Sequence, residues 1–316
     1  MEKKRYVTDS RPGRKAFSPS NLAYRPEYVY AWSDPCLMLL FWDHACLDGF
    51  GEEIVPDEEN GRAAVREGVP GALEKWYSGI GTYLYTLEDR GFHDGVTGWE
   101  TLSVTTETVA VTGEKRIGDV YGALLQAERE GLLAVYRYRE GREYQEELRL
   151  VRERSEEKEN RPVLIIEEGR LLRADTIAYA EEITVPPGVD SIGWNSMCET
   201  MVGRVVIPEG VTVIEEGAFY DSWVSEVVIP GSVERIESYA FGCCENLRDV
   251  TVPPGVTRIE PWAFGYRRSS SDYSTPVPNR FRLTVCGEKG SEAERYALEN
   301  EWHDGRRVIE FREMNS

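Results

Sequence analysis

Ile183-Thr-Val-Pro-Pro-Gly-Val189 is the first of four copies of one short phrase, and the spacing of these copies decides the fold of the C-terminal half. The other copies are Val205-Val-Ile-Pro-Glu-Gly-Val211, Val227-Val-Ile-Pro-Gly-Ser-Val233 and Val250-Thr-Val-Pro-Pro-Gly-Val256. Their prolines, at positions 186, 208, 230 and 253, are 22, 22 and 23 residues apart. A regular period of this length indicates a solenoid of stacked coils.

Each copy encodes a short strand followed by a turn. In the second copy, Val205 and Ile207 share one side of the strand while Val206 points away, because successive strand residues face opposite sides. Pro208 has no amide hydrogen for a strand ladder, so it ends the strand. Gly210 then allows the chain to turn where a side chain would obstruct it. The pattern predicts one strand per coil with a buried and an outward side.

A second apolar set follows each turn and closes the coil. It recurs as Val211, Ile214, Ala218 and Phe219, as Val233, Ile236, Ala240 and Phe241, and as Val256, Ile259, Ala263 and Phe264. One coil cannot bury this side alone, so neighbouring strands must stack about 4.8 Å apart. We therefore expect Phe219, Phe241 and Phe264 to form an aromatic ladder in the core, and a ligand-stacking role is the minor alternative. Ser196 and Met197 replace Ala-Phe in the first copy, as expected near the end of a stack.

The phrase h-x-h-Pro-x-Gly-Val-x-x-Ile-x-x-x-Ala-Phe resembles the bacterial leucine-rich repeat of the BspA type, over roughly residues 163–312, about half of the chain. Val163-Leu-Ile-Ile166 resembles the strand that precedes the first coil in this family, and Leu283-Thr-Val285 with Ala293-Glu294 resembles its closing strand and helix. The resemblance implies a short leucine-rich-repeat solenoid of stacked β-strand coils with a C-terminal capping helix. It also implies a non-enzymatic protein of adhesion or protein binding, and it brings no catalytic residues.

The closing helix has its own start signal. Ser291 and Glu294 have the offset of a capping box, in which the serine oxygen accepts an early helix amide and the glutamate reaches back. Ala293, Tyr296 and Ala297 would then face the last coil. We expect this helix to cover the open end of the stack.

The outward strand positions give a candidate binding face on the solenoid. Its residues are Thr184, Arg204, Val206, Glu226, Val228, Asp249 and Thr251. Adjacent valines at 206 and 228 suit a protein partner, although β-propensity explains them equally well. The insertion over 266–280, with Arg267, Arg268 and Tyr273, is a second candidate, because loops on rigid scaffolds often carry recognition. A tolerated surface insertion is the alternative reading.

The composition and charge limit the classes of partner that the protein can bind. The chain has 316 residues, 41 % of them hydrophobic, which suffices for two domains. Its formal charge is −19, and neither half has the basic excess that a nucleic-acid-binding surface needs, so we expect no nucleic-acid partner. The acidic charge favours solubility, or a basic partner.

The location is predicted to be cytoplasmic. The first ten residues lack the apolar run of a signal peptide. Cys36-Leu-Met-Leu-Leu-Phe-Trp42, the longest apolar stretch, is too short to cross a bilayer, so we expect no membrane partner. Cys198 lies two coils from Cys243 and Cys244, roughly 9 to 10 Å at the strand spacing and beyond the about 7 Å reach of a disulfide. We expect the six cysteines to be reduced.

The predicted organisation is a flexible basic arm over 1–20, an α+β domain with an antiparallel sheet over 21–160, and the repeat domain over 161–316. In the second part the sequence predicts an aromatic core segment over 28–47, helices over 72–77 and 118–130 and strand over 101–112. It also predicts an acidic surface loop over 48–61 and a hairpin of 132–139 with 144–151. This part resembles no family that we can name.

Catalysis in the N-terminal half has weak support. Cys36, Asp43, His44, Cys46 and the pair His93-Asp94 supply suitable residue types, but no third group is placed to orient His44 and Cys46, and no zinc spacing is present. We therefore predict no catalytic residue, no metal and no cofactor. The predicted function is protein recognition or scaffolding by the solenoid face. The alternatives are an enzyme around His44 and Cys46, or an immunity-type protein that binds a basic toxin.

Overall fold

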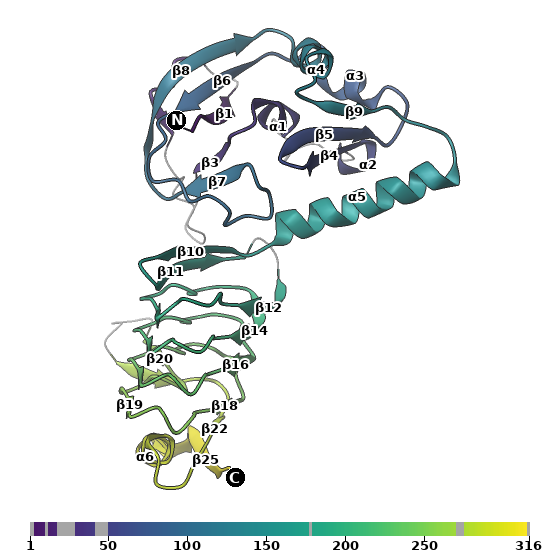
Figure 1. Ribbon diagram of the computed structural model, residues 1–316. Helices are drawn as coiled ribbons and strands as arrows, with labels where there is room; N and C mark the ends of the chain where they lie inside the picture. The colour runs from purple at the N-terminus through teal and green to yellow at the C-terminus, as the bar shows by residue number, and fades with distance from the viewer. Residues whose placement is uncertain are drawn as a thin grey trace. The chain divides into compact units, whose positions relative to one another are not determined.

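The structure is a computed structural model that describes residues 3–9, 12–17, 29–41, 50–176, 179–269 and 275–314 (Figure 1). The chain divides into two compact units, Met1–Glu159 and Asn160–Ser316. We describe each unit by itself.

The N-terminal unit is built on a six-stranded sheet with the order β2-β8-β6-β1-β3-β7, all of whose strand pairs are antiparallel. The strands are β1 (Arg5–Asp9), β2 (Ala16–Phe17), β3 (Val29–Trp32), β6 (Thr82–Leu87), β7 (Leu102–Thr105) and β8 (Val109–Ile117). A three-stranded sheet contains β4 (Ile54–Glu59), β5 (Arg62–Glu67) and β9 (Ala134–Tyr136). The antiparallel sheet expected in this unit is confirmed.

The described residues of this unit also form the helices α1 (Pro35–Leu40), α2 (Phe50–Glu53), α3 (Ala72–Tyr77), α4 (Val120–Arg129) and α5 (Arg142–Asn160). Leu37, Leu73 and Leu124, from α1, α3 and α4, share one buried cluster with Leu84 and Ile117 of the six-stranded sheet. The helices predicted over 72–77 and 118–130 are confirmed. The apolar residues of α4 are buried as expected, at Val120, Leu124 and Ala127.

The structure corrects the expectation of a flexible basic arm over 1–20, because part of this segment is a strand. Residues Arg5–Asp9 form β1, which pairs with β6 on one side and β3 on the other. Arg5 is buried and its guanidinium contacts Asp89 at 2.8 Å and Asp94 at 2.8 Å. A basic side chain can therefore lie inside this unit, because two carboxylates from a distant loop compensate its charge.

The acidic stretch over 48–61 was wrongly predicted as a surface loop. Its described part forms α2 and the buried strand β4. Asp57 of β4 is buried, and its carboxylate contacts Arg66 at 3.5 Å, Arg154 at 3.1 Å and Lys158 at 3.1 Å. The surrounding cations explain how an acidic strand enters the interior.

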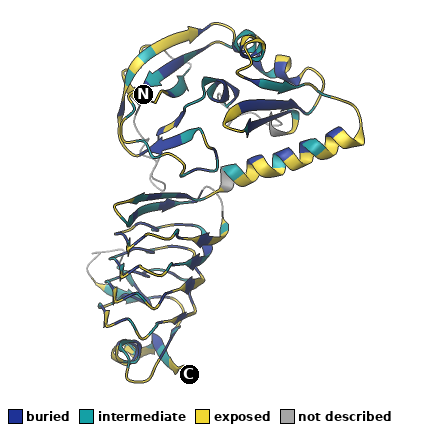
Figure 2. Ribbon diagram, in the orientation of Figure 1, coloured by how far each residue is buried: buried dark blue, intermediate teal, exposed yellow. Residues whose placement is uncertain are grey.

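The hairpin predicted from 132–139 and 144–151 is also wrong, because the second segment belongs to the 19-residue helix α5. Tyr144, Leu148, Val151 and Ser155 are buried along one side of α5, at the 3- and 4-residue spacing of a helix. Figure 2 shows the remaining exposed side of this helix.

The C-terminal unit is a solenoid of stacked coils, as predicted. A hairpin of β10 (Val163–Glu167) and β11 (Arg170–Asp175) precedes them and continues into a parallel row of β13 (Ser191–Ile192), β15 (Val213–Ile214), β17 (Arg235–Ile236) and β19 (Arg258–Ile259). A second parallel sheet contains β12 (Ala180–Thr184), β14 (Val202–Val206) and β16 (Glu226–Val228). A third contains β18 (Asp249–Thr251), β22 (Leu283–Gly287) and β25 (Ile309–Glu313).

The aromatic ladder is confirmed in the core. Phe219 and Phe241 stack with ring centroids 4.7 Å apart, and Phe241 and Phe264 stack at 4.8 Å. Met197 is fully buried and its amide donates to Ala218, as the amide of Phe219 does to Ala240, so the methionine takes the ladder position of the first coil.

The ladder ends against α6 (Glu292–Glu299). Tyr296 meets Phe264 edge-on at 5.8 Å, and its hydroxyl donates to the Phe264 carbonyl at 2.9 Å. Ala293, Tyr296 and Ala297 are buried as predicted. The capping box is wrong in detail, because the Ser291 hydroxyl donates to the Glu288 carbonyl, and Glu294 accepts from the Gly290 amide at 2.6 Å. Strand β25, beyond α6, was not predicted and adds a further coil position after β22.

Candidate functional site

The predicted strand face lies on β12, β14, β16 and β18. The first three strands are hydrogen-bonded in register, so Glu182, Arg204 and Glu226 form one row across the coils. Thr184, Val206 and Val228 form a second row in the same way. Side chains from three coils thus lie side by side at the strand spacing of about 4.8 Å.

The first row is an exposed ion-pair ladder. The Arg204 guanidinium bridges Glu182 on the coil before it and Glu226 on the coil after it, the latter with a 2.9 Å hydrogen bond from Nε. Hydrogen bonds from Arg204 and then Thr184 lower the pKa of Glu182. Because these groups are solvent-exposed, the ladder adds little stability. It fixes the positions of charges on the surface.

The second row carries the apolar part of the face. Val206 is half-buried and Val228 is 37 % exposed, whereas Val205 and Val227 between the rows are buried in the core. The alternation predicted from the sequence therefore holds along these strands. Asp249 and Thr251 are also exposed, but their strand β18 pairs with β22 and belongs to a different sheet from β16. The extra residue in the 23-residue spacing falls between these two strands.

The insertion forms a short hairpin of β20 (Tyr266–Arg268) and β21 (Pro276–Pro278). Arg268 is engaged within the unit: its guanidinium pairs with Glu216 and lies 4.7 Å over the Tyr239 ring. The Arg268 amide also donates to the Tyr220 hydroxyl at 3.2 Å. Arg267 lies in β20 opposite Val277, and Tyr273 lies outside the described residues. The hairpin is thus tied to the coils through Arg268.

Sequence reasoning missed an exposed column at the start of these strands, which we call the aromatic corner: Tyr179, Met201 and Trp223. Each residue lies seven positions before the proline of its coil, so the column was present in the repeat spacing. Tyr179 and Trp223 are each 57 % exposed, and Met201 is half-buried between them. Backbone bonds join the coils here, from Ala180 to the Met201 carbonyl at 2.8 Å and from Trp223 to the Thr200 carbonyl at 2.9 Å.

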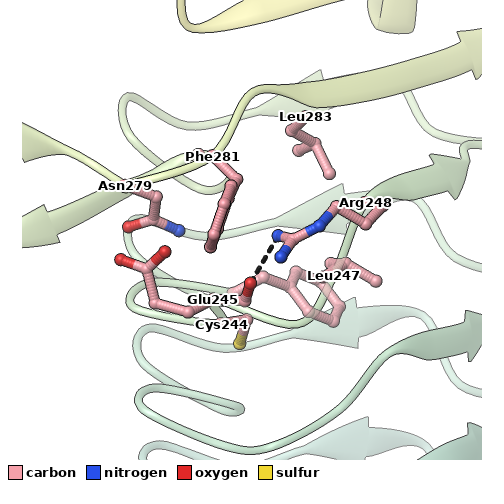
Figure 3. Close-up of a pocket in the computed structure, with 9 residues that line it drawn as sticks. Cys244, Glu245, Leu247, Arg248, Asn279, Phe281 and Leu283 are labelled. Carbon is pink, nitrogen blue, oxygen red and sulfur yellow. Dashed lines mark hydrogen bonds between the residues drawn. The ribbon is translucent and has the colours of Figure 1, made fainter.

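A small pocket lies between the Cys244–Arg248 loop and the segment after the hairpin (Figure 3). The Arg248 guanidinium lies 3.9 Å over the Phe281 ring and also donates to the Glu245 carbonyl, drawn as the dashed line in Figure 3. The pocket has a volume of about 10 Å³. That space suits one water molecule and no larger ligand.

The N-terminal candidates for catalysis do not come together as a site in the described part of the chain. Asp43, His44 and Cys46 lie outside the described residues. Cys36 is buried, and burial together with Asp34 raises the pKa of its thiol to about 12. Asp34 itself caps α1, accepting from the Cys36 amide at 2.7 Å. A thiol with this pKa is a poor nucleophile at neutral pH.

His93-Asp94 has a structural environment. Burial alone would raise the pKa of Asp94, but hydrogen bonds from Arg5, Ser103 and Lys3 outweigh it and lower this pKa. The His93 amide donates to the Val104 carbonyl at 2.8 Å, which ties the segment to β7. A carboxylate held ionised by several donors is a weak general base.

The described residues form no site for a metal ion, and their thiols are not activated. Within residues 3–9, 12–17, 29–41, 50–176, 179–269 and 275–314, no group of three or more His, Cys, Asp or Glu is placed to hold a metal ion. The five described cysteines are free thiols. Burial raises the pKa of Cys198 to about 11 and of Cys243 and Cys244 to about 12. These thiols pack as small apolar groups.

Comparison with known proteins places the repeats in a family. Residues 176–276 match the BspA type leucine rich repeat region, with six copies. A search of curated protein sequences gives no significant match. Among the described helices none is both long and apolar enough to span a membrane.

Two solved structures show partial similarity. A leucine rich cell surface protein of Faecalibacterium prausnitzii A2-165 is 17 % identical, with a TM-score of 0.30, over 40 % of this chain and 32 % of that one. The pneumococcal vaccine antigen PcpA is 16 % identical, with a TM-score of 0.27, over 40 % and 38 %. The matched part spans about a third of the length of these proteins. Together with the stacked coils and the aromatic ladder, the family match identifies residues 176–276 as BspA-type leucine-rich repeats.

Proposed function

We propose that this protein is a non-enzymatic recognition or scaffold protein whose partner binds the strand face, made of Thr184, Arg204, Val206, Glu226, Val228, Asp249 and Thr251. A leucine-rich-repeat fold suits protein interaction in general, because stacked coils present one extended surface. The observation that carries this proposal is the register of β12, β14 and β16, which aligns an apolar row beside a charged row.

The chemistry of the face fits a protein partner. Val206 and Val228 offer apolar area, and Arg204 with its two glutamates offers fixed charges about two residues away on the same strands. Apolar contact supplies affinity, while fixed charges select the partner and its orientation. A small ligand would need a concave site, which this face does not supply.

Rigidity is the second support. Phe219, Phe241 and Phe264 stack inside the coils, in the same buried core as Val205 and Val227 of the face strands, and Tyr296 closes the stack. A preformed surface loses little conformational entropy on binding. The N-terminal unit is then an accessory or an effector of the repeat domain.

The rival proposal places an enzyme in the N-terminal unit. It rests on His44 and Cys46, which the structure does not describe, and the described Cys36 and Asp94 have pKa values that disfavour catalysis. An immunity-type role against a basic toxin is compatible with the −19 charge.

We further propose a cytoplasmic location. The five described cysteines are free thiols, as is usual in a reducing compartment. Fractionation of the native cells tests this, and recovery of the protein at the cell surface would overturn it.

Affinity capture from the native cell tests the recognition surface. The full chain, Val228→Arg and a matched control, Val69→Arg, are compared with mass spectrometry of the retained proteins. Val69 and Val228 are each 37 % exposed, so both variants place the same charge at equally exposed positions. We expect Val228→Arg to lose at least about 90 % of the partner that the wild type and the control retain, because an interface core excludes unpaired charge. Equal retention by all three would refute the proposed face.

A further inference from the structure

We propose that the aromatic corner, Tyr179, Met201 and Trp223, binds an arginine- or lysine-rich segment of a partner protein. This inference rests on the proposed recognition function and names the chemistry of the partner. The corner begins the same strands as the strand face, with Met201 three residues before Arg204 and Trp223 three residues before Glu226. At the rise of a strand this is about 10 Å along the chain.

The corner is held in place by the fold. Tyr179 lies across the next coil, with its hydroxyl 2.3 Å from where a Cβ on Gly203 would stand. A glycine at 203 therefore leaves room for the Tyr179 ring on the second coil. Backbone bonds fix Met201 and Trp223 on their coils. The three residues thus occupy the same position on three successive coils.

Two carboxylates flank the aromatic corner. Glu199 and Asp221 stand two residues before Met201 and Trp223, on adjacent coils, and both are exposed. The Glu199 amide donates to the Tyr220 carbonyl at 2.9 Å, which brings the two acidic residues together. Partial desolvation of the Glu199 carboxylate, and then the like charge of the neighbouring Asp221, raise the pKa of Glu199.

The stretch of sequence that carries these coils is strongly acidic, although Arg173 and Arg267 from outside it lie near Cys198 and Cys243. From Tyr179 to Val256 there are thirteen Asp and Glu residues against three basic ones, Arg204, Arg235 and Arg248. All three have other partners: Arg204 joins Glu182 and Glu226, Arg235 pairs with Glu237 at 3.1 Å, and Arg248 stacks on Phe281. The charge of this region therefore selects a cationic occupant.

An arginine or lysine side chain can interact with both the aromatic rings and the two carboxylates. A guanidinium or ammonium can lie over the Trp223 or Tyr179 ring and reach Glu199 or Asp221 at its edge. An acidic or purely apolar segment would leave the two carboxylates uncompensated, and a phosphate-bearing ligand would be repelled.

Fluorescence anisotropy with a labelled nona-arginine peptide tests the corner on the full chain at 0.15 M salt. We expect Trp223→Ala to weaken binding about two- to fivefold, and Tyr179→Ala with Trp223→Ala about tenfold. Glu199→Gln with Asp221→Asn should weaken it by a similar factor. Trp223→Phe, which keeps an aromatic ring, should bind within about twofold of wild type.

Matched controls separate the corner from general attraction to an acidic protein. Trp302 is 60 % exposed, so Trp302→Ala removes an equally exposed indole elsewhere in the same unit. Glu156→Gln with Glu157→Gln removes the same charge from the exposed side of α5. Both controls should bind within about twofold of wild type. Equal weakening by controls and corner variants, or no binding of the peptide to the wild type, would overturn the proposal.

The two proposals fail in different ways. If the corner variants bind the peptide like wild type while Val228→Arg still loses its captured partner, the basic-segment proposal falls and the recognition face stands. If the corner variants lose the peptide while Val228→Arg keeps every captured partner, the strand face falls and the corner stands.

Discussion

Phe241 is the residue on which the solenoid core most depends. Its ring is buried and stacks on Phe219 at 4.7 Å and on Phe264 at 4.8 Å. Removing it leaves a cavity between two coils, because the backbone bonds on both sides fix their spacing.

We predict that Phe241→Ala lowers the free energy of unfolding by about 3 to 5 kcal/mol. Urea unfolding of the full chain measures this. Phe281→Ala is the control, since Phe281 is 43 % exposed and its loss should cost far less. An unchanged urea midpoint for Phe241→Ala would contradict the ladder.

The residues that the sequence predicted well are those repeated from coil to coil. Val205, Ile207 and the three phenylalanines recur every 22 or 23 residues, so their burial follows from periodicity alone. The capping box predicted at Ser291 is wrong because an N-cap depends on local backbone geometry. The Ser291 hydroxyl donates to the Glu288 carbonyl instead of accepting from a helix amide. The aromatic corner was overlooked because its members, Tyr, Met and Trp, share a position and not a residue type.

Among the elements, α5 shows why the N-terminal half was harder to predict. Its apolar positions 144, 148 and 151 have helical spacing, but they are separated by charged residues and follow a glycine that suggested a hairpin turn. The helix is held by contacts distant in sequence: Arg154 and Lys158 reach Asp57 in β4, and the Ser155 hydroxyl donates to the Pro56 carbonyl at 2.9 Å. No local pattern encodes these contacts.

We predict that Asp57→Asn lowers the free energy of unfolding by about 2 to 3 kcal/mol, because it weakens charge-assisted bonds from the buried Asp57 carboxylate to buried Arg66, half-buried Lys158 and exposed Arg154. Chemical unfolding of the full chain gives the value. Glu153→Gln on the same helix is the control, since Glu153 forms an exposed pair with Arg149 that should be worth well under 1 kcal/mol. Similar small effects in both variants would show that Asp57 does not anchor α5.

At the scale of the whole molecule, the repeat pattern predicts the fold of one unit and is silent on the other. The solenoid repeats one structural solution, so four copies of a phrase identify it. The positions of the N-terminal unit do not recur in a repeat, so periodicity gives no signal there. Its central strand β1 lies in a segment whose composition predicted a basic arm. The strand face was predictable as a surface, whereas the identity of its partner depends on a second molecule.

The most direct test of the central claim is hydroxyl-radical footprinting of the full chain with and without the captured partner. We expect protection of side chains on β12, β14 and β16, above all Val206 and Val228, while Leu132 and Val69 in the N-terminal unit keep their reactivity. Protection confined to the N-terminal unit, with Val206 and Val228 unchanged, would contradict the claim that the repeat domain is the recognition surface.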